Sequence, residues 1–517
     1  MNINYFSSNQ ILPLFIGAII LIFSILFFNS GKTKLGLTLL FLGAMALGFF
    51  MANLDPYLIM WDEQYHALVA KNLTFDIFKP TLYVNPLLKY DYKNWTGNHI
   101  WMHKQPLFLW QMALSLKLFG MNTLAVRLPS IILHAIAVLM IYRIGKISSN
   151  EKTGFYGALF FAVAYYPLEL IAGHYSTDHN DLSFLFYITA SFWAWFEYQH
   201  TQKKQYLVLI GLFAGCAVLV KWLVGLLIYG VWFFTIGASD KRNWVKIKSY
   251  YPLLISIRIS LLVFLPWQIY CYLQYPLEFI HEINYNSQHL FKVIEGHGGD
   301  VWFHFNALKD IYGSNVVVGI YLISLVVFIV KMNARSYRVA ILSAIVITYT
   351  FFTIAATKMI SFCIIVSPFA FLALGSLVNT ASVYLSTKIK YKKFEFIFSS
   401  VALVVVVALI MNVPKIEQYH TNWKPNDNCH REIELYELEI IKRLKHQLGD
   451  ENYVVFYTAG FRNIQTMFFT NYIAYDFIPT KEQIAQVEST KYKIAILDDG
   501  ALPKYINDKN EIVKIKR

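Results

Sequence analysis

Long apolar runs separated by short polar segments dominate this chain. A helix that crosses a membrane needs about 20 predominantly apolar residues. Runs that approach or reach this length lie at 11–28, 35–52, 126–145, 154–172, 182–198, 206–220, 223–237, 251–272, 314–331, 339–356, 360–379 and 395–412. The runs 206–220 and 223–237 flank Lys221 and are either two spans joined by a tight turn or one broken helix. The pattern predicts an α-helical polytopic membrane protein with about 11–13 spans.

Two segments break this pattern. Within 53–122, the stretches 62–73 and 106–119 carry apolar residues at helical spacing, which is typical of helices that lie flat in a membrane interface; a structural cover over the bundle is the alternative. The tail 413–517 is polar with short apolar runs, and its length suits one small soluble α/β domain. We therefore expect two N-terminal spans (1–52), an outer loop with interfacial helices (53–122), a membrane bundle that includes outer loop 273–313 (123–412), and an outer soluble domain (413–517).

The composition agrees with a membrane protein. Hydrophobic residues make up 56% of the chain and charged residues only 15%, whereas soluble domains carry about 25% charged residues. This excludes disordered, collagen-like and disulfide-stapled chains. The four cysteines (Cys216, Cys271, Cys363 and Cys429) show no metal-binding or secreted-disulfide spacing. The first apolar run lacks a basic region and a cleavage site, so we expect a retained span rather than a signal peptide.

The net charge of +13 could indicate nucleic acid or a membrane topology signal. Short cytoplasmic loops carry an excess of Lys and Arg, and alternation along the spans places every basic loop on one side. These loops are 32–34, 143–152, 203–204, 241–248, 331–338 and 388–393. The charge is therefore mostly a topology signal, and no nucleic-acid partner is expected. The other side receives 53–122, 173–181, Lys221, 273–313, 357–359 and the tail.

The outer side also collects short motifs in a fixed order. They are Trp61–Tyr65, His103–Trp110, Phe119-Gly120, Arg127–Ser130, Thr177-Asp178, Lys221, His289, Glu295–Phe303 and Thr357–Pro368. Together they resemble the GT-C superfamily of polyprenyl-phosphate-sugar-dependent glycosyltransferases, in particular the branch of bacterial aminoarabinose–lipid A transferases and protein O-mannosyltransferases.

The resemblance implies a GT-C-like fold and transfer of a sugar or glycan from a polyprenyl (undecaprenyl-type) phosphate donor, with inversion. The acceptor would be a hydroxyl or phosphate of a protein, lipid A or a glycan. It also implies a multi-pass protein of the bacterial inner membrane, with the active site and the C-terminal domain on the periplasmic face. A transporter or lipid flippase is the alternative, although its ionisable residues would gather at the membrane midplane rather than at the outer face.

Glycosyl transfer requires a base for the acceptor proton and cations for the departing phosphate. The resemblance places the base at Asp62, with Asp178 as a second catalytic acid that positions the acceptor or supports the base. A structural acid pair at a helix start and a solvated loop are the alternatives. The candidate substrate-binding residues are Glu63, Lys104, Arg127, Lys221, His289, His297 and Lys358.

Lys104, Lys221 and Lys358 are the candidate phosphate ligands among these, because lysine binds phosphate as a point charge. Lys221 interrupts an apolar run, where a charge is costly without a partner or a purpose. Each lysine has an alternative: Lys104 is a rim lysine, Lys221 reaches the interface along its own stem, and Lys358 anchors the end of a span. Arg127 either orients a headgroup or anchors its span.

A metal ion is a further hypothesis. Some members of the family have a metal that bridges two outer loops, and the matching positions here are His103 and His297. A divalent ion (Zn, Mg or Mn) at these residues is one interpretation. Hydrogen bonds from His289 and His297 to the donor are the other. The glycines of 296–299 permit backbone conformations closed to other residues, so this loop either approaches another group closely or forms a plain turn.

Overall fold

The computed structural model describes residues 6–175, 177–238, 240–389, 394–422, 431–458, 460 and 462–517. It divides into two compact units. The first comprises Met1–Leu54, Ser130–Gln274 and Glu282–Ile416, and the second comprises Asp55–Pro129, Tyr275–His281 and Glu417–Arg517. Lys390, Lys392, Lys393 and Cys429 lie outside the described residues.

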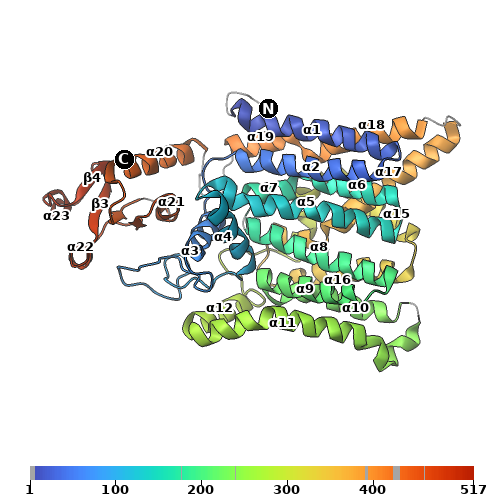
Figure 1. Cartoon of the computed structure of the whole chain (residues 1–517), viewed down its shortest axis with the longest axis horizontal. Coiled ribbons are helices and arrows are strands. Elements are labelled where there is room, and N and C mark those ends of the chain that lie inside the picture. Colours follow the sequence, from blue (N-terminus) through green and yellow to red (C-terminus); the bar gives the residue numbers. More distant parts are fainter. Residues whose placement is uncertain are drawn as a thin grey trace. The chain divides into compact units, whose positions relative to one another are not determined.

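The first unit is a bundle of helices (Figure 1). Its helices are α1 (Ser8–Asn29), α2 (Thr33–Asn53), α5 (Thr123–Ser148, of which the first residues belong to the second unit), α6 (Glu151–Ala162), α7 (Tyr165–Ala172), α8 (Asp178–Thr201), α9 (Gln205–Lys221), η1 (Trp222–Leu226), α10 (Leu227–Ile236), η2 (Lys241–Val245), η3 (Ile247–Tyr250), α11 (Tyr251–Gln274), α12 (Pro276–Gln288, shared with the second unit), α13 (Phe303–Asn306), α14 (Leu308–Tyr312), α15 (Asn315–Lys331), α16 (Arg335–Ile354), η4 (Ile360–Val366), α17 (Ser367–Ile389), α18 (Phe394–Met411) and the start of α19 (Val413–Asn422).

Eight helical segments of the described chain are long and apolar enough to cross a membrane, or up to ten if two bent helix pairs each form one span. The predicted fold class, an α-helical polytopic membrane protein, is confirmed. Even the higher of these two counts is lower than the number of apolar runs, for two reasons. The runs 206–220 and 223–237 fall in one segment, Gln205–Ile236, and α8 is not among the eight.

The segment Gln205–Ile236 is interrupted directly after Lys221. Trp222 has a positive φ of 57°, and a Cβ on Gly225 would lie 2.4 Å from the backbone nitrogen of Val218. The chain therefore makes a tight turn against the end of α9, and only glycine fits at this contact. Lys221 is the last residue of α9 and lies beside this turn.

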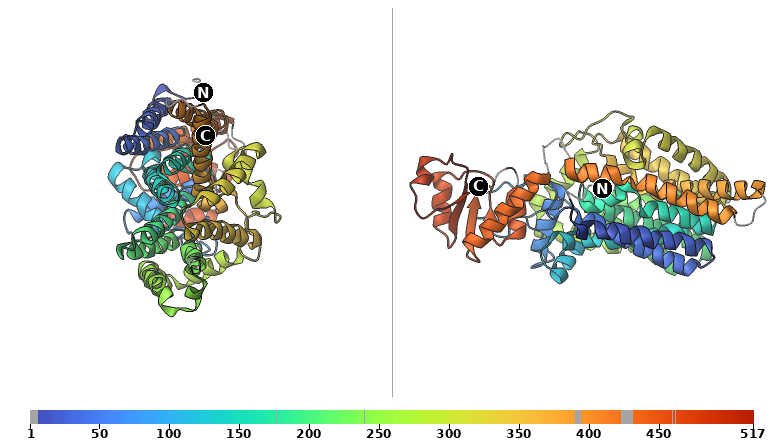
Figure 2. Two further views of the ribbon diagram at one scale, coloured as in Figure 1. Left: turned by 90° about the vertical axis from the view of Figure 1, so that its right-hand side faces the viewer. Right: turned by 90° about the horizontal axis from the view of Figure 1, so that it is seen from above.

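Close helix packing holds the middle of the bundle together. A Cβ on Gly157 in α6 would lie 2.7 Å from Leu372 Cα in α17, and one on Gly375 would lie 2.6 Å from Gly157 N. Small residues let helix backbones approach closely where no hydrophobic effect drives association in lipid. Figure 2 shows these helices end-on, packed side by side.

Hydrogen bonds between loops define one end of the bundle. Lys331 Nζ donates to Thr380 Oγ1 at 3.0 Å, and Asn333 Nδ2 donates to Ser149 O at 2.8 Å. Basic loops 143–152, 331–338 and the end of α17 therefore meet there. Because α8, α9, α16 and α17 each run from one end to the other, Asp178, Lys221 and Lys358 lie at the opposite end.

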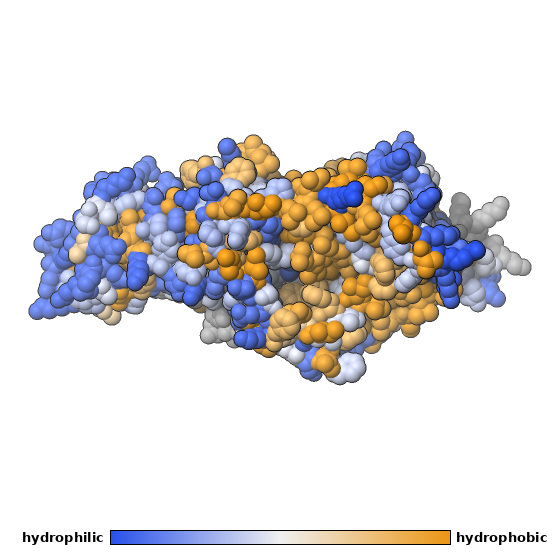
Figure 3. Space-filling model, turned by 90° about the horizontal axis from the view of Figure 1, so that it is seen from below, coloured by the Kyte–Doolittle hydropathy of each residue, from blue (hydrophilic) through white to orange (hydrophobic). Residues whose placement is uncertain are grey.

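Apolar side chains cover the outside of the bundle. Figure 3 shows hydrophobic residues over most of its visible face. On α11, for example, Leu262 and Leu273 are 76% and 67% exposed. A protein surface that faces water rarely carries so large an apolar area, whereas a surface in contact with lipid chains does.

The second unit contains the two helices expected at the interface, α3 (Asp62–Leu73) and α4 (Leu107–Phe119). They pack against each other. The residues of α3 from Glu63 onward are buried, whereas α4 leaves Leu114, Leu118 and Phe119 at least 60% exposed. Of the two helices, α4 thus presents the apolar face that an interfacial helix needs.

The expected small C-terminal α/β domain is confirmed. It contains α20 (Arg431–Leu448), β1 (Tyr453–Phe456), α21 (Arg462–Phe469), β2 (Ile473–Ala474), α22 (Lys481–Glu488), β3 (Lys493–Asp498), α23 (Lys504–Asn507) and β4 (Val513–Lys516). The strands form one parallel sheet in the order β2-β1-β3-β4. Val454 of β1 pairs with Ile473 and with Ile494, and all four residues of β1 are buried, as in a sheet covered on both faces.

Candidate active site

Asp62 begins α3 directly after a strained residue. Trp61 has φ 77°, a backbone conformation that costs about 1–3 kcal/mol for a bulky residue and often accompanies function. The Asp62 side chain is 16% exposed, and its Oδ1 lies 3.7 Å from Lys104 Nζ and 3.8 Å from His66 Nε2. The structure thus brings together two of the predicted site residues, Asp62 and Lys104, and adds His66, which the sequence interpretation had not named.

Glu63 points to a different partner, because successive helical residues are rotated by about 100°. Its carboxylate and the Arg127 guanidinium are both fully buried. Arg127 Nε donates to Glu63 Oε1 at 2.7 Å, and Arg127 Nη2 donates to Glu63 Oε2 at 2.9 Å. Arg127 also donates to the carbonyls of Asp55 and Tyr57. This geometry supports a structural pair and the anchoring alternative for Arg127, rather than contact with a substrate.

His103 lies in an aromatic cluster. It stacks on Trp95 with ring centroids 4.5 Å apart and meets Trp101 edge-on at 5.7 Å. Tyr65, from the same helix as Asp62, packs edge-on against Trp95 at 4.9 Å. His103 is 5% exposed, so its environment is that of a packed ring beside the Asp62–Lys104 pair.

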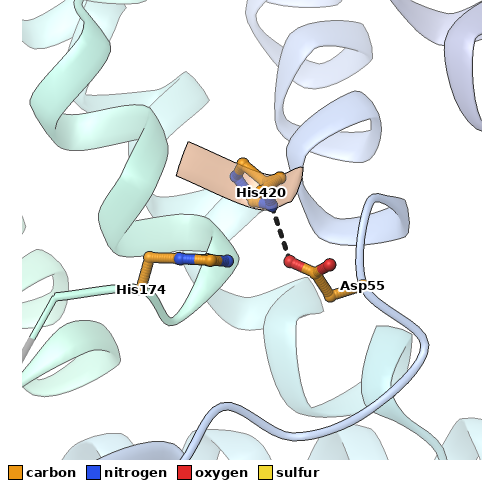
Figure 4. A group of neighbouring side chains, drawn as sticks. All are labelled: Asp55, His174 and His420. Carbon is orange, nitrogen blue, oxygen red and sulfur yellow. Dashed lines mark hydrogen bonds and ion pairs between the residues drawn. The ribbon is translucent and has the colours of Figure 1, made fainter. Parts of the chain in front are cut away.

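Two buried charged residues, Asp55 and Lys71, attach the first part of this unit to its C-terminal part. Asp55 is fully buried and bonds to His420 Nδ1 at 2.6 Å (Figure 4). It also forms an ion pair with Arg431. Lys71, at the end of α3, donates to the carbonyls of Met467, Phe468 and Thr470. The helix that carries Asp62 is therefore fixed directly to the C-terminal domain.

The first unit holds a second polar cluster. Lys221 Nζ forms an ion pair with Asp181 and lies 4.8 Å from the centroid of the Phe362 ring. Thr177 donates to the same carboxylate and also contacts Ser361 at 3.4 Å. The lysine is 20% exposed and Asp181 is 2% exposed. This arrangement resolves why a lysine interrupts the apolar run: it has a buried carboxylate partner.

Asp178 begins α8 after Thr177, whose φ is 67°. Asp178 is fully buried, and its carboxylate accepts a hydrogen bond from the amide of His179. His179 in turn contacts Ser130 at 2.8 Å. The candidate second acid therefore lies one helical turn from Asp181, but it is Asp181 that meets the lysine.

Lys358 donates to backbone carbonyls at the end of α16. Its Nζ lies 2.8 Å from Thr353 O, 2.7 Å from Ala355 O and 3.4 Å from Phe352 O, and the residue is 5% exposed. Lysine commonly satisfies the last carbonyls of a helix in this way. The contacts support the alternative in which Lys358 anchors a span end.

His289 and His297 border a loop that runs beside Thr357 and Lys358. His289 Nδ1 lies 3.0 Å from Thr357 Oγ1, and the amide of Lys358 donates to His297 O at 2.9 Å. Gly296 has φ 75°. The expected close approach of the glycine-containing loop is thus a backbone contact with the segment that enters η4.

The metal hypothesis receives no support from the donor set. In the described residues, neither His103 nor His297 belongs to a group of three His, Cys, Asp or Glu side chains close enough to share an ion. His103 is packed between tryptophan rings. We therefore assign no step to a metal.

The sequence analysis named most of the residues at these sites, but it did not predict which side chains they contact. Asp181 stands three residues after Asp178, near the start of the same helix. The roles of Thr177, Phe362 and Thr357 depend on contacts between segments far apart in the chain, and no local pattern indicates them.

Known proteins resemble this chain in sequence. The sequence model of the dolichyl-phosphate-mannose-protein mannosyltransferase family matches residues 103–270. An uncharacterized protein of Aquifex aeolicus is 27% identical over 229 residues, 43% of this chain and 42% of that protein. An undecaprenyl phosphate-alpha-4-amino-4-deoxy-L-arabinose arabinosyl transferase of Pseudomonas paraeruginosa is 27% identical over 190 residues, 34% of this chain and 32% of that protein. The chain thus spans less than half the length of either relative.

The fold is similar to that of solved structures over most of the chain. ArnT from Cupriavidus metallidurans bound to undecaprenyl phosphate has a TM-score of 0.61 at 13% identity, with 88% of each chain covered. The oligosaccharyltransferase of Archaeoglobus fulgidus, tethered with an acceptor peptide, has a TM-score of 0.54 at 11% identity, covering 90% of this chain and 69% of that one. These structures confirm the GT-C-like fold, and the sequence matches to the mannosyltransferase family and the arabinosyl transferases confirm the resemblance to such glycosyltransferases.

Proposed function

We propose that this protein is a membrane glycosyltransferase that moves a sugar or glycan from a polyprenyl-phosphate-linked donor to an acceptor hydroxyl or phosphate, with inversion. Lipid A, a protein side chain and a glycan are the acceptor classes. The names of the related Pseudomonas enzymes and of the structurally similar ArnT complex support an undecaprenyl-phosphate-type donor. We place the reaction on the periplasmic side of the membrane, because the positive-inside rule assigns the basic loops to the cytoplasm.

The observation that carries this proposal is the difference between the two neighbouring acids. Glu63 is fully buried and held by Arg127, so it is committed to the fold. Asp62 is partly exposed beside Lys104 and follows a strained tryptophan. Asp62 is therefore the acid of the pair that an acceptor hydroxyl can reach, as a general base must be.

In this mechanism the Asp62 carboxylate takes the proton from the acceptor O–H while the oxygen attacks the anomeric carbon. The bond from that carbon to the phosphate oxygen breaks, and polyprenyl phosphate leaves with the bonding electrons. Attack from the face opposite the phosphate inverts the anomeric centre. Lys104, beside Asp62 in the same unit, stabilises the negative charge that grows on the leaving phosphate.

The test is transfer by the purified full-length protein from a defined undecaprenyl-phosphate sugar to lipid A, peptide and glycan acceptors. We expect Asp62→Asn to lower kcat by about 10²–10⁴-fold, the usual contribution of general base catalysis. Asp91→Asn, which removes an exposed acid of the same unit, is the matched control and should keep full activity. A folded Asp62→Asn protein with wild-type kcat would refute the base, and no transfer to any acceptor would refute the activity.

A further inference from the structure

A hollow in the first unit, separate from the clusters described above, places opposite charges on its wall. It lies among α7, α14, α15, α17 and the α18–α19 junction. Its polar lining includes Tyr165, Asp310, Tyr321, Asn412 and Lys415, and its apolar lining includes Phe371 and Leu409. It therefore combines the features of a ligand site, an apolar wall with a few polar groups.

The two charges in this hollow lack a side-chain partner of opposite sign. Lys415 Nζ lies over the Tyr165 ring, 4.2 Å from its centroid. Within the described residues neither Lys415 nor Asp310 forms an ion pair, although Asp310 and Glu169 both act electrostatically on Lys415. A cation and an anion that share a hollow without meeting leave room for a ligand that carries both charges.

A third polar group faces no partner either. The Tyr321 hydroxyl is buried, and the described part of the chain offers it no hydrogen-bond partner. A buried hydroxyl without a partner costs about 1–3 kcal/mol. A bound acceptor atom would remove this cost.

The surroundings of the hollow point to a lipid. It lies where α18 ends and α15 begins, so it is at the end of the bundle away from the basic loops. On α18, Val405 and Leu409 are 52% and 72% exposed, and on α15 Val316 is 75% exposed. Such side chains line a path along which acyl chains can lie while a headgroup enters the hollow.

We propose that this hollow binds the headgroup of a phosphatidylethanolamine-type lipid. Its phosphate binds Lys415 and accepts from the Tyr321 hydroxyl, and its primary ammonium donates to Asp310. A purely anionic headgroup satisfies the lysine but leaves the Asp310 carboxylate uncompensated. A trimethylammonium headgroup carries the charge but has no N–H to donate to Asp310.

The test uses the full-length protein in detergent after removal of native lipid. Native mass spectrometry measures retention of dioleoyl phosphatidylethanolamine, phosphatidylglycerol and phosphatidylcholine at equal concentration. We expect the ethanolamine lipid to be retained about 10-fold more than the others, the effect of one charge-assisted hydrogen bond. Lys415→Gln and Asp310→Asn should each reduce its retention to the level of the others.

Lys309→Gln, an exposed neighbour of Asp310, is the matched control and should retain the lipid as wild type does. Asp310→Asn keeps the size of the side chain, so it decides the question if Lys415→Gln does not fold. Equal retention of the three lipids, or wild-type retention by Asp310→Asn, would overturn the proposal. Full competition by soluble glycerophosphoethanolamine would also overturn it, because the ligand would then be a soluble phosphoamine.

Discussion

Arg127 and Glu63 form a bidentate pair in which both side chains are fully buried. The arginine also donates to two backbone carbonyls of the segment that precedes α3. This one side chain thus fixes the loop that leads into Asp62 and the helix that begins there. The relationship divides the paired acids into one that supports the fold and one that is available for chemistry.

The first prediction concerns that division. Arg127→Ala leaves a buried carboxylate without its cation, which typically costs about 3–5 kcal/mol. We expect a large fall in Tm and loss of transfer together. Asp62→Asn should lose transfer with its Tm unchanged. Thermal unfolding of both variants in detergent checks this, and an Arg127→Ala protein as stable as wild type would contradict the structural role.

The second prediction concerns Lys221 and Asp181. If Lys221 binds the donor phosphate, Lys221→Met should lower kcat/KM for the donor by about 10–100-fold, the value of one or two charged hydrogen bonds. Lys221→Arg should recover part of this loss, because the charge remains. Lys204→Met, at the opposite end of α9 in an exposed position, is the control. An unchanged donor KM and kcat in Lys221→Met would show that the lysine only neutralises Asp181.

The third prediction separates two roles of Lys358. Its three carbonyl contacts at the end of α16 suggest that Lys358→Met destabilises the protein by about 1–3 kcal/mol, with the donor KM within about twofold of wild type. Lys292→Met, an exposed lysine of the neighbouring loop, should change neither quantity. A raised donor KM at unchanged Tm would instead identify Lys358 as a phosphate ligand.

The local pattern of the sequence was sufficient for the helical membrane fold. Apolar runs long enough to span a membrane can be recognised one at a time. In lipid, an α-helix makes its backbone hydrogen bonds within its own segment, so no partner segment has to be known. The short runs 454–457 and 493–497 likewise correspond to β1 and β3. Asp62 was predicted from the short motif Trp61–Tyr65, which lies in one continuous segment and needs no information about distant residues.

The partners of these residues could not be predicted in the same way. Arg127 is 64 positions from Glu63, and Lys221 is 40 positions from Asp181. Such pairs form only when helices pack, and the sequence pattern does not specify which faces meet. The contacts of Lys358 depend on where α16 ends, and helix ends are the least certain part of any sequence interpretation. The candidate residues could therefore be named from the sequence, but whether each one supports the fold or takes part in the reaction could not be predicted.

The last prediction concerns the pH dependence of stability, and it rests on Lys71. This lysine is 8% exposed and donates to three carbonyls at the end of α21. Burial, with a smaller effect of Lys445, lowers the pKa of Lys71 to about 8. An unfolded chain keeps the lysine pKa near about 10.4.

The sign follows from proton binding. Below pH 8 both states hold the proton, so the contribution of Lys71 does not change with pH. Between about pH 8 and 10.4 the unfolded state binds more protons than the folded state, and stability therefore rises with pH. The gain at the upper end is about 3 kcal/mol, since one pKa unit is worth about 1.4 kcal/mol.

Other groups titrate in this window, so the measurement compares wild type with Lys71→Met. We expect the difference in free energy of unfolding, wild type minus variant, to increase by about 3 kcal/mol from pH 7.5 to 10.5. Lys93→Met, an exposed lysine of the same unit, should show a constant difference. Denaturant unfolding of the full chain, followed at several pH values, provides the numbers. A wild type minus Lys71→Met difference that stays level or falls as pH rises would show that the three carbonyls hold the ammonium in its charged form despite its burial.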